Sequence, residues 1–272
     1  MNCTGYISEI FGSFQGEGPF VGERHIFVRL AGCSLGCNYC DTTYSMTESG
    51  HARLEEADGG LLYLENPLPV RTVIEAVSSH EIFSGFNSKL AITGGEPLEQ
   101  PEFLRALLEG LDGRFKVLLE TNGVLPGALL RVKELVDIIS MDFKLPSATG
   151  KGEFWDAHRE FVEAARGKEL IAKAVVSRQT PKEEVEMAAN ILAKAAPDAI
   201  FVIQPMTPSP SPIPPRGEGS GIYPSPTGGR EGWGNEDYAP SPEKLIQIYL
   251  LAKRILRNVR VIPQVHKILG VK

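Results

Sequence analysis

Three cysteines near the start of the chain lie within eight residues of one another. Cys33, Cys37 and Cys40 form a C-x3-C-x2-C pattern, whereas the fourth cysteine, Cys3, stands alone. Thiolates at this spacing can bind three corners of a [4Fe–4S] cluster and leave one iron open to a small molecule. The alternative is a structural zinc site, which usually takes four protein ligands. The sequence has no second C-x2-C or H-x3-H pattern to complete such a set, so the spacing favours the cluster.

A glycine-rich motif follows the cysteines. Thr93-Gly94-Gly95-Glu96-Pro97 comes at the end of an apolar run at Lys89–Thr93. Glycines allow a close approach between backbone and ligand, and loops after parallel strands form the active-site face of βα barrels. The motif alone is ordinary turn chemistry. Its position one predicted strand after the cysteines indicates a second ligand-binding loop.

Polar residues also recur at the ends of later apolar runs. They are Glu120 to Gly123, Ser140, Asp142, Lys144, Lys173 and Gln204. Each one alone is as well explained as a cap or a turn residue. Their repetition at successive strand ends is typical of the mouth of a barrel.

Apolar runs alternate with helix-like stretches along most of the chain. The predicted strands are His25–Ala31, Lys89–Thr93, Phe115–Glu120, Val136–Met141, Glu169–Val176, Ala199–Gln204 and Arg260–Ile262. The predicted helices are Val70–Ser79, Pro101–Glu109, Pro126–Leu135, Glu153–Arg166, Pro181–Lys194 and Ser241–Arg257. This alternation predicts an α/β fold of parallel βαβ units. Six or so units in about 250 residues favour a partial (βα)6-type, TIM-like barrel over a doubly wound sheet.

One segment, from Pro208 to about Gly234, interrupts this alternation. It is dense in Pro, Gly and Ser and has very few core-forming residues. Such a composition cannot bury enough apolar surface to offset its ordering entropy. We therefore expect one domain over residues 1–272 with a disordered loop inserted at about 208–234. A proline-rich docking site for a partner is the less favoured alternative.

The composition is that of an ordinary globular enzyme. Charged residues make up 23% of the chain, hydrophobic residues make up 42%, and the net charge is -6. This balance does not favour nucleic acid or anionic membranes as partners. The sequence shows no apolar run of about 20 residues and no signal-peptide pattern. We expect a cytoplasmic protein, in which the cysteines are reduced and serve as ligands or stay inert.

The cysteine segment reads CSLGCNYC, with an aromatic residue before the last cysteine. It resembles the signature of the radical S-adenosylmethionine (SAM) superfamily. The resemblance implies that the open iron is chelated by the amino and carboxylate groups of SAM. Cleavage of SAM would then give a 5′-deoxyadenosyl radical that abstracts a hydrogen from the substrate. The Gly94-Gly95-Glu96-Pro97 segment is similar to the one that holds the methionine end of SAM in that superfamily.

Motifs elsewhere in the chain resemble the 7-carboxy-7-deazaguanine synthase family of radical SAM enzymes. They are EIFGSFQGEG at 9–18, FVRLAGC at 27–33, CDT at 40–42, QPMT at 204–207 and RVIPQVHK at 260–267. The resemblance covers nearly the whole chain apart from the Pro/Gly-rich insert and residues 51–69. The QGEG motif also occurs in some activating-enzyme relatives. A glycyl-radical activating enzyme that acts on a protein partner is therefore the alternative.

The family resemblance implies a reaction, cofactors and partners. The reaction is ring contraction of 6-carboxy-5,6,7,8-tetrahydropterin to 7-carboxy-7-deazaguanine with loss of ammonia, in queuosine-type 7-deazapurine biosynthesis, a tRNA modification pathway. The cofactors are a [4Fe–4S] cluster, SAM and Mg²⁺. The partners are the small pterin substrate, an electron donor of the flavodoxin kind and a second copy of the chain in a homodimer.

The resemblance also implies roles for individual residues. The residues that would hold the substrate are Phe14, Gln15, Gly16, Arg29 and Thr93. The residues that would hold SAM are Tyr39, Cys40, Asp41, Gly95, Ser140, Lys144, Gln204, Pro205, Met206 and Thr207. Thr42 would bind Mg²⁺, and Glu120 and His266 are the candidates for catalytic groups near the pterin.

The chemistry of these residue types is compatible with that assignment. An arginine such as Arg29 can pair with a carboxylate through two hydrogen bonds. Gln15 and Glu17 supply the amide and acceptor groups that a guanidine-like ring edge needs. The apolar residues beside Arg29 predict a strand but leave its face undetermined. The segment Ser140–Lys144 departs from the family's Ser-Pro-Lys, which leaves the SAM contacts there open.

Overall fold

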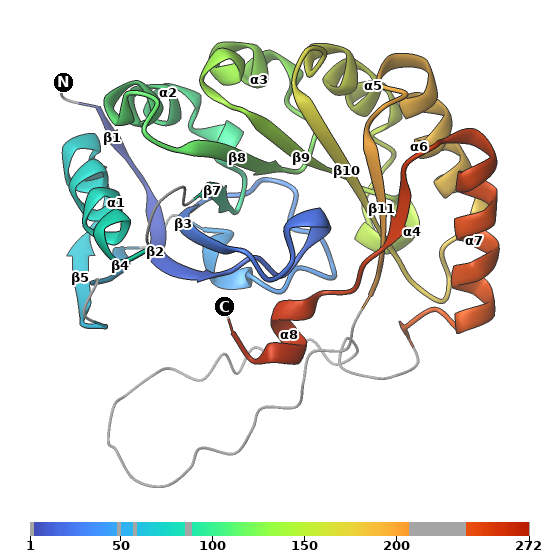
Figure 1. Cartoon of the computed structure of the whole chain (residues 1–272), viewed down its shortest axis with the longest axis horizontal. Helices are drawn as coiled ribbons and strands as arrows, with labels where there is room; N and C mark the ends of the chain where they lie inside the picture. The colour runs from blue at the N-terminus through green and yellow to red at the C-terminus, as the bar shows by residue number, and fades with distance from the viewer. Residues whose placement is uncertain (1–2, 48–49, 57–58, 85–88, 207–237, 272) are drawn as a thin grey trace, which may run out of the picture.

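A computed structural model describes residues 3–47, 50–56, 59–84, 89–206 and 238–271. The Pro/Gly-rich insert predicted at 208–234 lies outside these residues. Within the described part, ten strands form one continuous curved sheet, and most of the helices lie along its outer side (Figure 1).

Seven neighbouring strands of this sheet are parallel, in the order β12-β11-β10-β9-β8-β7-β3. They are β3 (Arg24–Leu30), β7 (Lys89–Gly94), β8 (Lys116–Thr121), β9 (Ile138–Phe143), β10 (Glu169–Val176), β11 (Ile200–Pro205) and β12 (Val259–Val261). All seven coincide with the predicted strands to within a few residues. The partial barrel predicted from the alternating pattern is therefore confirmed.

Helices alternate with the parallel strands, and the last helix follows the last strand. They are α1 (Val70–Ser84), α2 (Pro101–Leu111), α3 (Pro126–Val132), α4 (Pro146–Thr149), α5 (Trp155–Ala164), α6 (Lys182–Ala195), α7 (Pro242–Ile255) and α8 (Val265–Leu269), with short 3-10 turns η1 (Gly18–Phe20), η2 (Thr43–Ser45), η3 (Pro97–Glu99) and η4 (Lys133–Leu135). Proline opens α2, α3 and α7, where its missing N–H costs nothing because the first turn has no partner for it. Ser241 caps α7 by accepting a hydrogen bond from the Lys244 amide at 3.3 Å. The predicted helices are confirmed.

The sheet continues past β3 with strands that the sequence pattern did not predict. They are β2 (Ile7–Phe14), β4 (His51–Glu55) and β5 (Leu61–Glu65), while β1 (Thr4–Gly5) and β6 (Leu68–Pro69) form a separate small ladder. β2 runs antiparallel to β3, and β4 runs parallel to β2. β2 carries Glu9 and Ser13, which are buried although both are polar. Its core-facing residues therefore do not form the apolar run by which the other strands were recognised.

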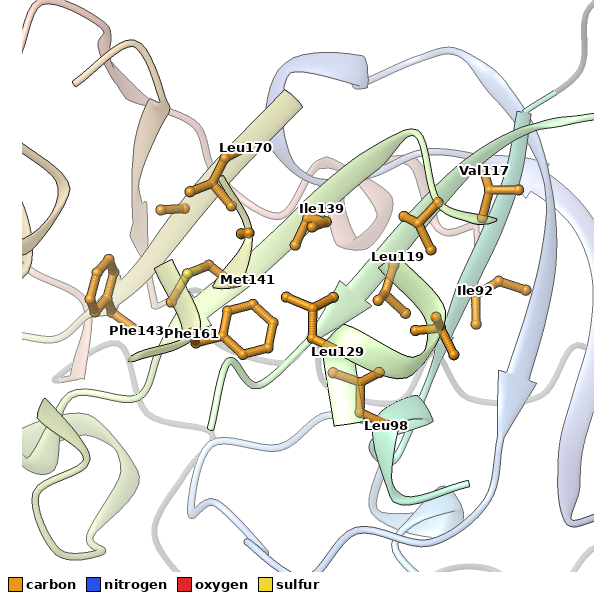
Figure 2. Packing of buried hydrophobic residues seen from close by; sticks show 14 of the residues in the cluster. Ile92, Leu98, Val117, Leu119, Leu129, Ile139, Met141, Phe143, Phe161 and Leu170 are labelled. Carbon is orange, nitrogen blue, oxygen red and sulfur yellow. The ribbon is translucent and has the colours of Figure 1, made fainter. Parts of the chain in front are cut away.

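Side chains of the parallel strands alternate between two apolar layers. One layer packs between the sheet and the helices, where Ile92, Leu119, Ile139 and Met141 meet residues such as Phe161 of α5 (Figure 2). The other layer lies on the inner side of the sheet and takes one residue from β2 and from each parallel strand except β12: Phe11, Phe27, Ala91, Leu118, Ile138, Ile171 and Val202. Since successive side chains of a strand point to opposite faces, this alternation decides which residues face the barrel interior.

The interior is closed by two segments from the ends of the chain. The turn between β2 and β3 folds inward, held by the Gln15 amide on the Glu23 carbonyl at 2.8 Å, and Phe20 packs against the inner apolar layer. The C-terminal segment crosses the same opening, and the Val265 amide donates to the Gly16 carbonyl at 2.8 Å (Figure 1). The barrel is thus completed by loops rather than by further strands.

The helices of the described residues are too short or too polar to cross a bilayer.

Helix α3 offers a matched test of the outer layer. Leu129 is 0% exposed and packs against the sheet, whereas the adjacent Leu130 is 62% exposed. We predict that Leu129→Ala lowers the free energy of unfolding by about 2–5 kcal/mol, because it removes buried contacts and leaves a cavity. Leu130→Ala should change it by less than about 0.5 kcal/mol. Urea unfolding followed by circular dichroism measures both, and equal effects would contradict this packing.

Candidate active site

A cavity of about 490 Å³ lies at the end of the sheet to which the parallel strands point. Its wall combines four parts of the chain: the cysteine loop, the ends of the parallel strands, the turn after β2 and the C-terminal segment. Loops at this end of parallel strands form the active sites of βα barrels. The fold therefore brings the chemically distinctive motifs of the sequence to one place.

The cysteine loop forms one side of the cavity. Cys33, Cys37 and Cys40 all line it, and none of them forms a disulfide. The loop is anchored at Gly32, whose amide donates to the Ser45 carbonyl at 2.8 Å, and Gly32 has a φ of 100°, a region that favours glycine. Burial raises the pKa of the Cys33 and Cys37 thiols, so a bound metal must supply the charge that keeps them as thiolates. Three thiols on one cavity wall fit a cluster held by three protein ligands.

The glycine motif packs directly against the cysteine loop. A Cβ atom on Gly94 would lie 2.2 Å from the Leu30 carbonyl oxygen, and one on Gly95 would lie 2.1 Å from the Gly32 carbonyl oxygen. The Gly95 amide donates to the Leu30 carbonyl at 2.9 Å. Any larger residue would force the two loops apart. Glycine is therefore required here by the close approach of two backbones.

Glu96 fixes the base of the same loop. Its side chain is 0% exposed and accepts hydrogen bonds from the Leu98 amide at 2.9 Å, the Thr121 hydroxyl at 2.8 Å and the Asn122 amide at 2.7 Å. Burial raises the pKa of Glu96 to about 7, although these donors oppose the shift. The carboxylate ties the end of β7 to the end of β8. Glu96, the acidic residue of the motif, thus holds the glycine loop in position.

A polar layer lies above the inner apolar layer. On five strands, the residue two positions after the inner apolar residue lines the cavity: Arg29, Thr93, Glu120, Lys173 and Gln204. The parallel register aligns these strands, with Arg29 beside Thr93 and Lys173 beside Asp142. Because every second residue of a strand faces the same side of the sheet, these polar side chains lie on the floor of the cavity. Arg29, whose face the sequence left undetermined, points into the barrel.

Four charged residues on the cavity floor form a buried chain of ion pairs. Lys144 Nζ lies 2.8 Å from Asp142 Oδ2, Lys173 Nζ lies 3.3 Å from Asp142 Oδ1, and Lys173 also contacts Glu17. Burial alone would lower the pKa of each lysine, but Asp142 together with other acidic neighbours, such as Glu17 beside Lys173, outweighs burial and raises the pKa of both. Lys144 Nζ also donates to Tyr39 Oη at 3.2 Å, next to Cys40. Two positive and two negative charges therefore balance one another beneath the cysteine loop.

The C-terminal segment holds Asp41, the residue after Cys40. Gln264 Nε2 donates to Asp41 Oδ2 at 3.0 Å and to Glu17 Oε1 at 2.9 Å. Lys267 Nζ lies 3.3 Å and His266 Nε2 lies 3.7 Å from Asp41 Oδ2. Burial would raise the pKa of Asp41, but His266 and Lys267 outweigh it and hold that pKa far below its usual range. No role was predicted for Gln264 or Lys267, although both belong to the RVIPQVHK motif at 260–267.

The structure brings most of the predicted site residues together. The cavity wall contains Phe14, Gln15, Gly16, Arg29, Tyr39, Asp41, Thr42, Thr93, Gly95, Glu120, Lys144, Gln204, Met206 and His266. Ser140 is 5% exposed and lies beneath the cavity, where Asp142 takes the lining position two residues later on β9. Pro205 does not line the cavity, and Thr207 lies outside the described residues. Tyr44 and Asp142 also line it, although no role was predicted for either.

Comparisons with known proteins agree on the family. The sequence profile of the Radical SAM superfamily matches residues 28–197. A 7-carboxy-7-deazaguanine synthase of Geobacter sulfurreducens is 35% identical over 97% of this chain and 96% of its own length. One of Methanopyrus kandleri is 34% identical over 96% of this chain and 92% of its own. The crystal structure of QueE from Escherichia coli superposes with a TM-score of 0.55 at 18% identity, covering 97% of this chain and 95% of that one, which shows a shared fold.

The three cavity cysteines give a direct test of the metal site. We predict that anaerobic reconstitution with iron and sulfide produces a broad absorbance near roughly 400 nm from a thiolate-bound cluster. Alanine at Cys33, Cys37 or Cys40 should abolish it, because each removes one of three ligands. Cys3→Ala is the control, since Cys3 lies outside the cavity wall and should keep the full absorbance. A stable, complete cluster in Cys37→Ala would refute the assignment of ligands.

Proposed function

Because the chain belongs to the 7-carboxy-7-deazaguanine synthases of the radical SAM superfamily, we propose that it converts 6-carboxy-5,6,7,8-tetrahydropterin to 7-carboxy-7-deazaguanine with loss of ammonia. One observation carries the proposal beyond the family name. Three free thiols share a cavity with Arg29 and Gln15, side chains suited to a carboxylate and to a polar ring edge. The glycyl-radical activating enzyme is not favoured, since the relatives of highest identity given above are synthases.

The cysteine loop would hold the cluster, and the adjacent Gly95, Tyr39 and Lys144 would hold SAM. When bound, the cluster and SAM together supply a carbon radical able to take a hydrogen atom from the substrate. The protein's own part is to orient these groups and to exclude water. The Glu96 anchor and the Gly94–Leu30 backbone contact keep the glycine loop beside the cysteine loop for that purpose.

The substrate would occupy the opposite part of the cavity. Arg29 would bind its carboxylate, while Gln15 and Thr93 would contact the pterin ring. Gln15 Nε2 donates to Glu120 Oε1 at 2.9 Å, and this bond orients both the nitrogen and the oxygen of the side-chain amide. Glu120 and His266 line the same wall and are the candidates to hold or release protons as ammonia leaves. Phe14 and Gly16 would complete the contact with the ring.

Mg²⁺ would be held by Thr42 on the cavity wall. Its hydroxyl oxygen is a weak neutral ligand, which suits an ion that keeps waters and takes oxygen from substrate. Glu17, Asp41 and His266 carry ligand atoms within 4.8 Å of one another nearby. Their carboxylates already contact Lys173, Gln264 and Lys267. The donor set thus fits a metal that depends on substrate and water more than on protein carboxylates.

The proposed reaction also requires partners. SAM cleavage needs one electron, which a flavodoxin-like donor would supply. The thiolate ligands require a reducing compartment such as the cytoplasm. We further propose a homodimer, as the family resemblance implies, and a place in queuosine-type tRNA modification.

Anaerobic turnover tests the proposed function. Reconstituted protein is mixed with the carboxypterin, SAM, Mg²⁺ and a chemical reductant, and the deazapurine product is followed by chromatography and absorbance. We expect product to form only when all components are present. If SAM is cleaved but no deazapurine forms, the superfamily chemistry stands and the proposed substrate is wrong.

The magnesium role of Thr42 predicts a separate result. Thr42→Val keeps the side-chain shape but removes the oxygen, so carboxypterin turnover should fall and lose its response to Mg²⁺. Cluster absorbance and SAM cleavage should persist. Thr43→Val is the matched control, because Thr43 is exposed and lies outside the cavity wall. Wild-type turnover with unchanged Mg²⁺ dependence in Thr42→Val would leave Thr42 as a residue of the turn only.

A further inference from the structure

Glu9 is a buried carboxylate beside the proposed substrate site, and it is not itself part of the cavity wall. It lies on β2 and is 3% exposed. Its Oε1 accepts hydrogen bonds from Arg29 Nε at 3.0 Å and from Tyr44 Oη at 2.7 Å. Its Oε2 accepts from a terminal nitrogen of Arg53 at 3.0 Å. One carboxylate therefore joins β3, the end of the cysteine loop and β4.

The bond to Glu9 fixes how Arg29 is presented. Among the described residues, the side chain of Arg29 donates a hydrogen bond only through Nε, and its guanidinium lies 5.8 Å from the ring centre of Phe11. A guanidinium is planar, so a hydrogen bond at Nε on one edge fixes the orientation of the terminal nitrogens on the other. Those terminal nitrogens form the two-pronged donor that a carboxylate accepts. They remain available to a ligand in the cavity.

The charges around Glu9 favour an anionic ligand. Two guanidiniums, those of Arg29 and Arg53, share one carboxylate, so pairing at Glu9 does not neutralise both. Glu120 also raises the pKa of Arg29 through its negative charge, but no ion pair joins the two among the described residues, and Glu120 Oε1 accepts a hydrogen bond from Gln15. By contrast, the chain of ion pairs on the cavity floor has equal numbers of positive and negative charges, from Lys144, Asp142, Lys173 and Glu17. The terminal nitrogens of Arg29, which Glu9 does not engage, are thus the donors placed to bind a ligand's carboxylate.

We infer that Glu9 is a positioning residue: it orients Arg29 toward the substrate carboxylate, and Arg53 and Tyr44 hold Glu9 in place for that task. This inference rests on the proposed function, because it takes a carboxylated pterin as the ligand. Arg53 comes from the segment 51–69, to which the family resemblance did not extend. The hairpin β4–β5 therefore acquires a role at the active site although its residue Arg53 does not line the cavity.

The test compares two stable ligands that differ only in the carboxylate. Binding of 6-carboxypterin and of pterin to the cluster-containing protein with SAM is measured anaerobically by titration calorimetry. Glu9→Gln combined with Arg53→Gln removes one negative and one positive charge, so the net charge is unchanged, while Arg29 keeps its charge and loses its partner carboxylate. We expect this double variant to bind 6-carboxypterin about tenfold more weakly, because Arg29 loses its orientation. Its affinity for pterin should change by less than about twofold, which a general loss of structure would not allow.

Tyr44→Phe supplies a second variant, since it releases one hydrogen bond to Glu9 without changing charge. It should weaken 6-carboxypterin binding about threefold and leave pterin binding unchanged. Arg29→Lys measures the full loss of carboxylate preference. Glu23→Gln is the control that should change neither affinity, because Glu23 precedes β3, lies outside the cavity wall and pairs with Lys89. A retained preference for 6-carboxypterin in the double variant and in Tyr44→Phe would overturn the inference. A wild-type protein that shows no such preference would instead refute the proposed substrate.

Discussion

Ion pairs and side-chain hydrogen bonds on the inner face of the sheet join segments that are far apart in the sequence. Lys173 on β10 contacts Glu17 in the turn after β2, and Gln264 near the C-terminus bonds to Glu17 and to Asp41. Glu9 connects β3 with β4 in the same way. The open side of the barrel is closed by loops, which share few backbone hydrogen bonds with the sheet. Their place in the fold therefore depends on these side-chain contacts.

Such contacts constrain the structure more than they stabilise it. Removing two charges from water costs several kcal/mol per ion in proteins, and their attraction only offsets this when both partners are well placed. Asp142 illustrates the balance, because burial alone would raise its pKa, whereas Lys144 and Lys173 lower it. The loss of one partner would leave a buried charge unpaired. The network thus penalises any arrangement in which the loops are displaced, and it keeps the cavity in one form.

The two ligand loops are coupled by backbone packing. Gly94 lies so close to Leu30 at the end of β3, and Gly95 to Gly32 in the cysteine loop, that neither position has room for a Cβ atom. Glu96 holds the glycine loop from below. A cluster bound by the cysteines and a SAM molecule bound by the glycines would consequently sit at a fixed separation. Radical chemistry depends on such placement, because the reactive group must meet the substrate before it meets water.

The sequence by itself determined the elements and the chemistry of the cysteines. Parallel strands that are buried on both faces read as continuous apolar runs, and ligand spacing in a single loop is local information. β2 was missed because Glu9 on it is buried through partners on other strands, which local patterning cannot reveal.

Only the tertiary structure decided which side chains meet. The register of β9 and β10 placed Asp142 rather than Ser140 at the cavity, and the face of Arg29 followed from its pairing with β7. The hydrogen bond from Gln264 to Asp41 spans 223 positions of the chain. Contacts of this kind arise when the curved sheet brings the C-terminal segment to the cysteine loop and the turn after β2, and they leave no periodic signal in the sequence.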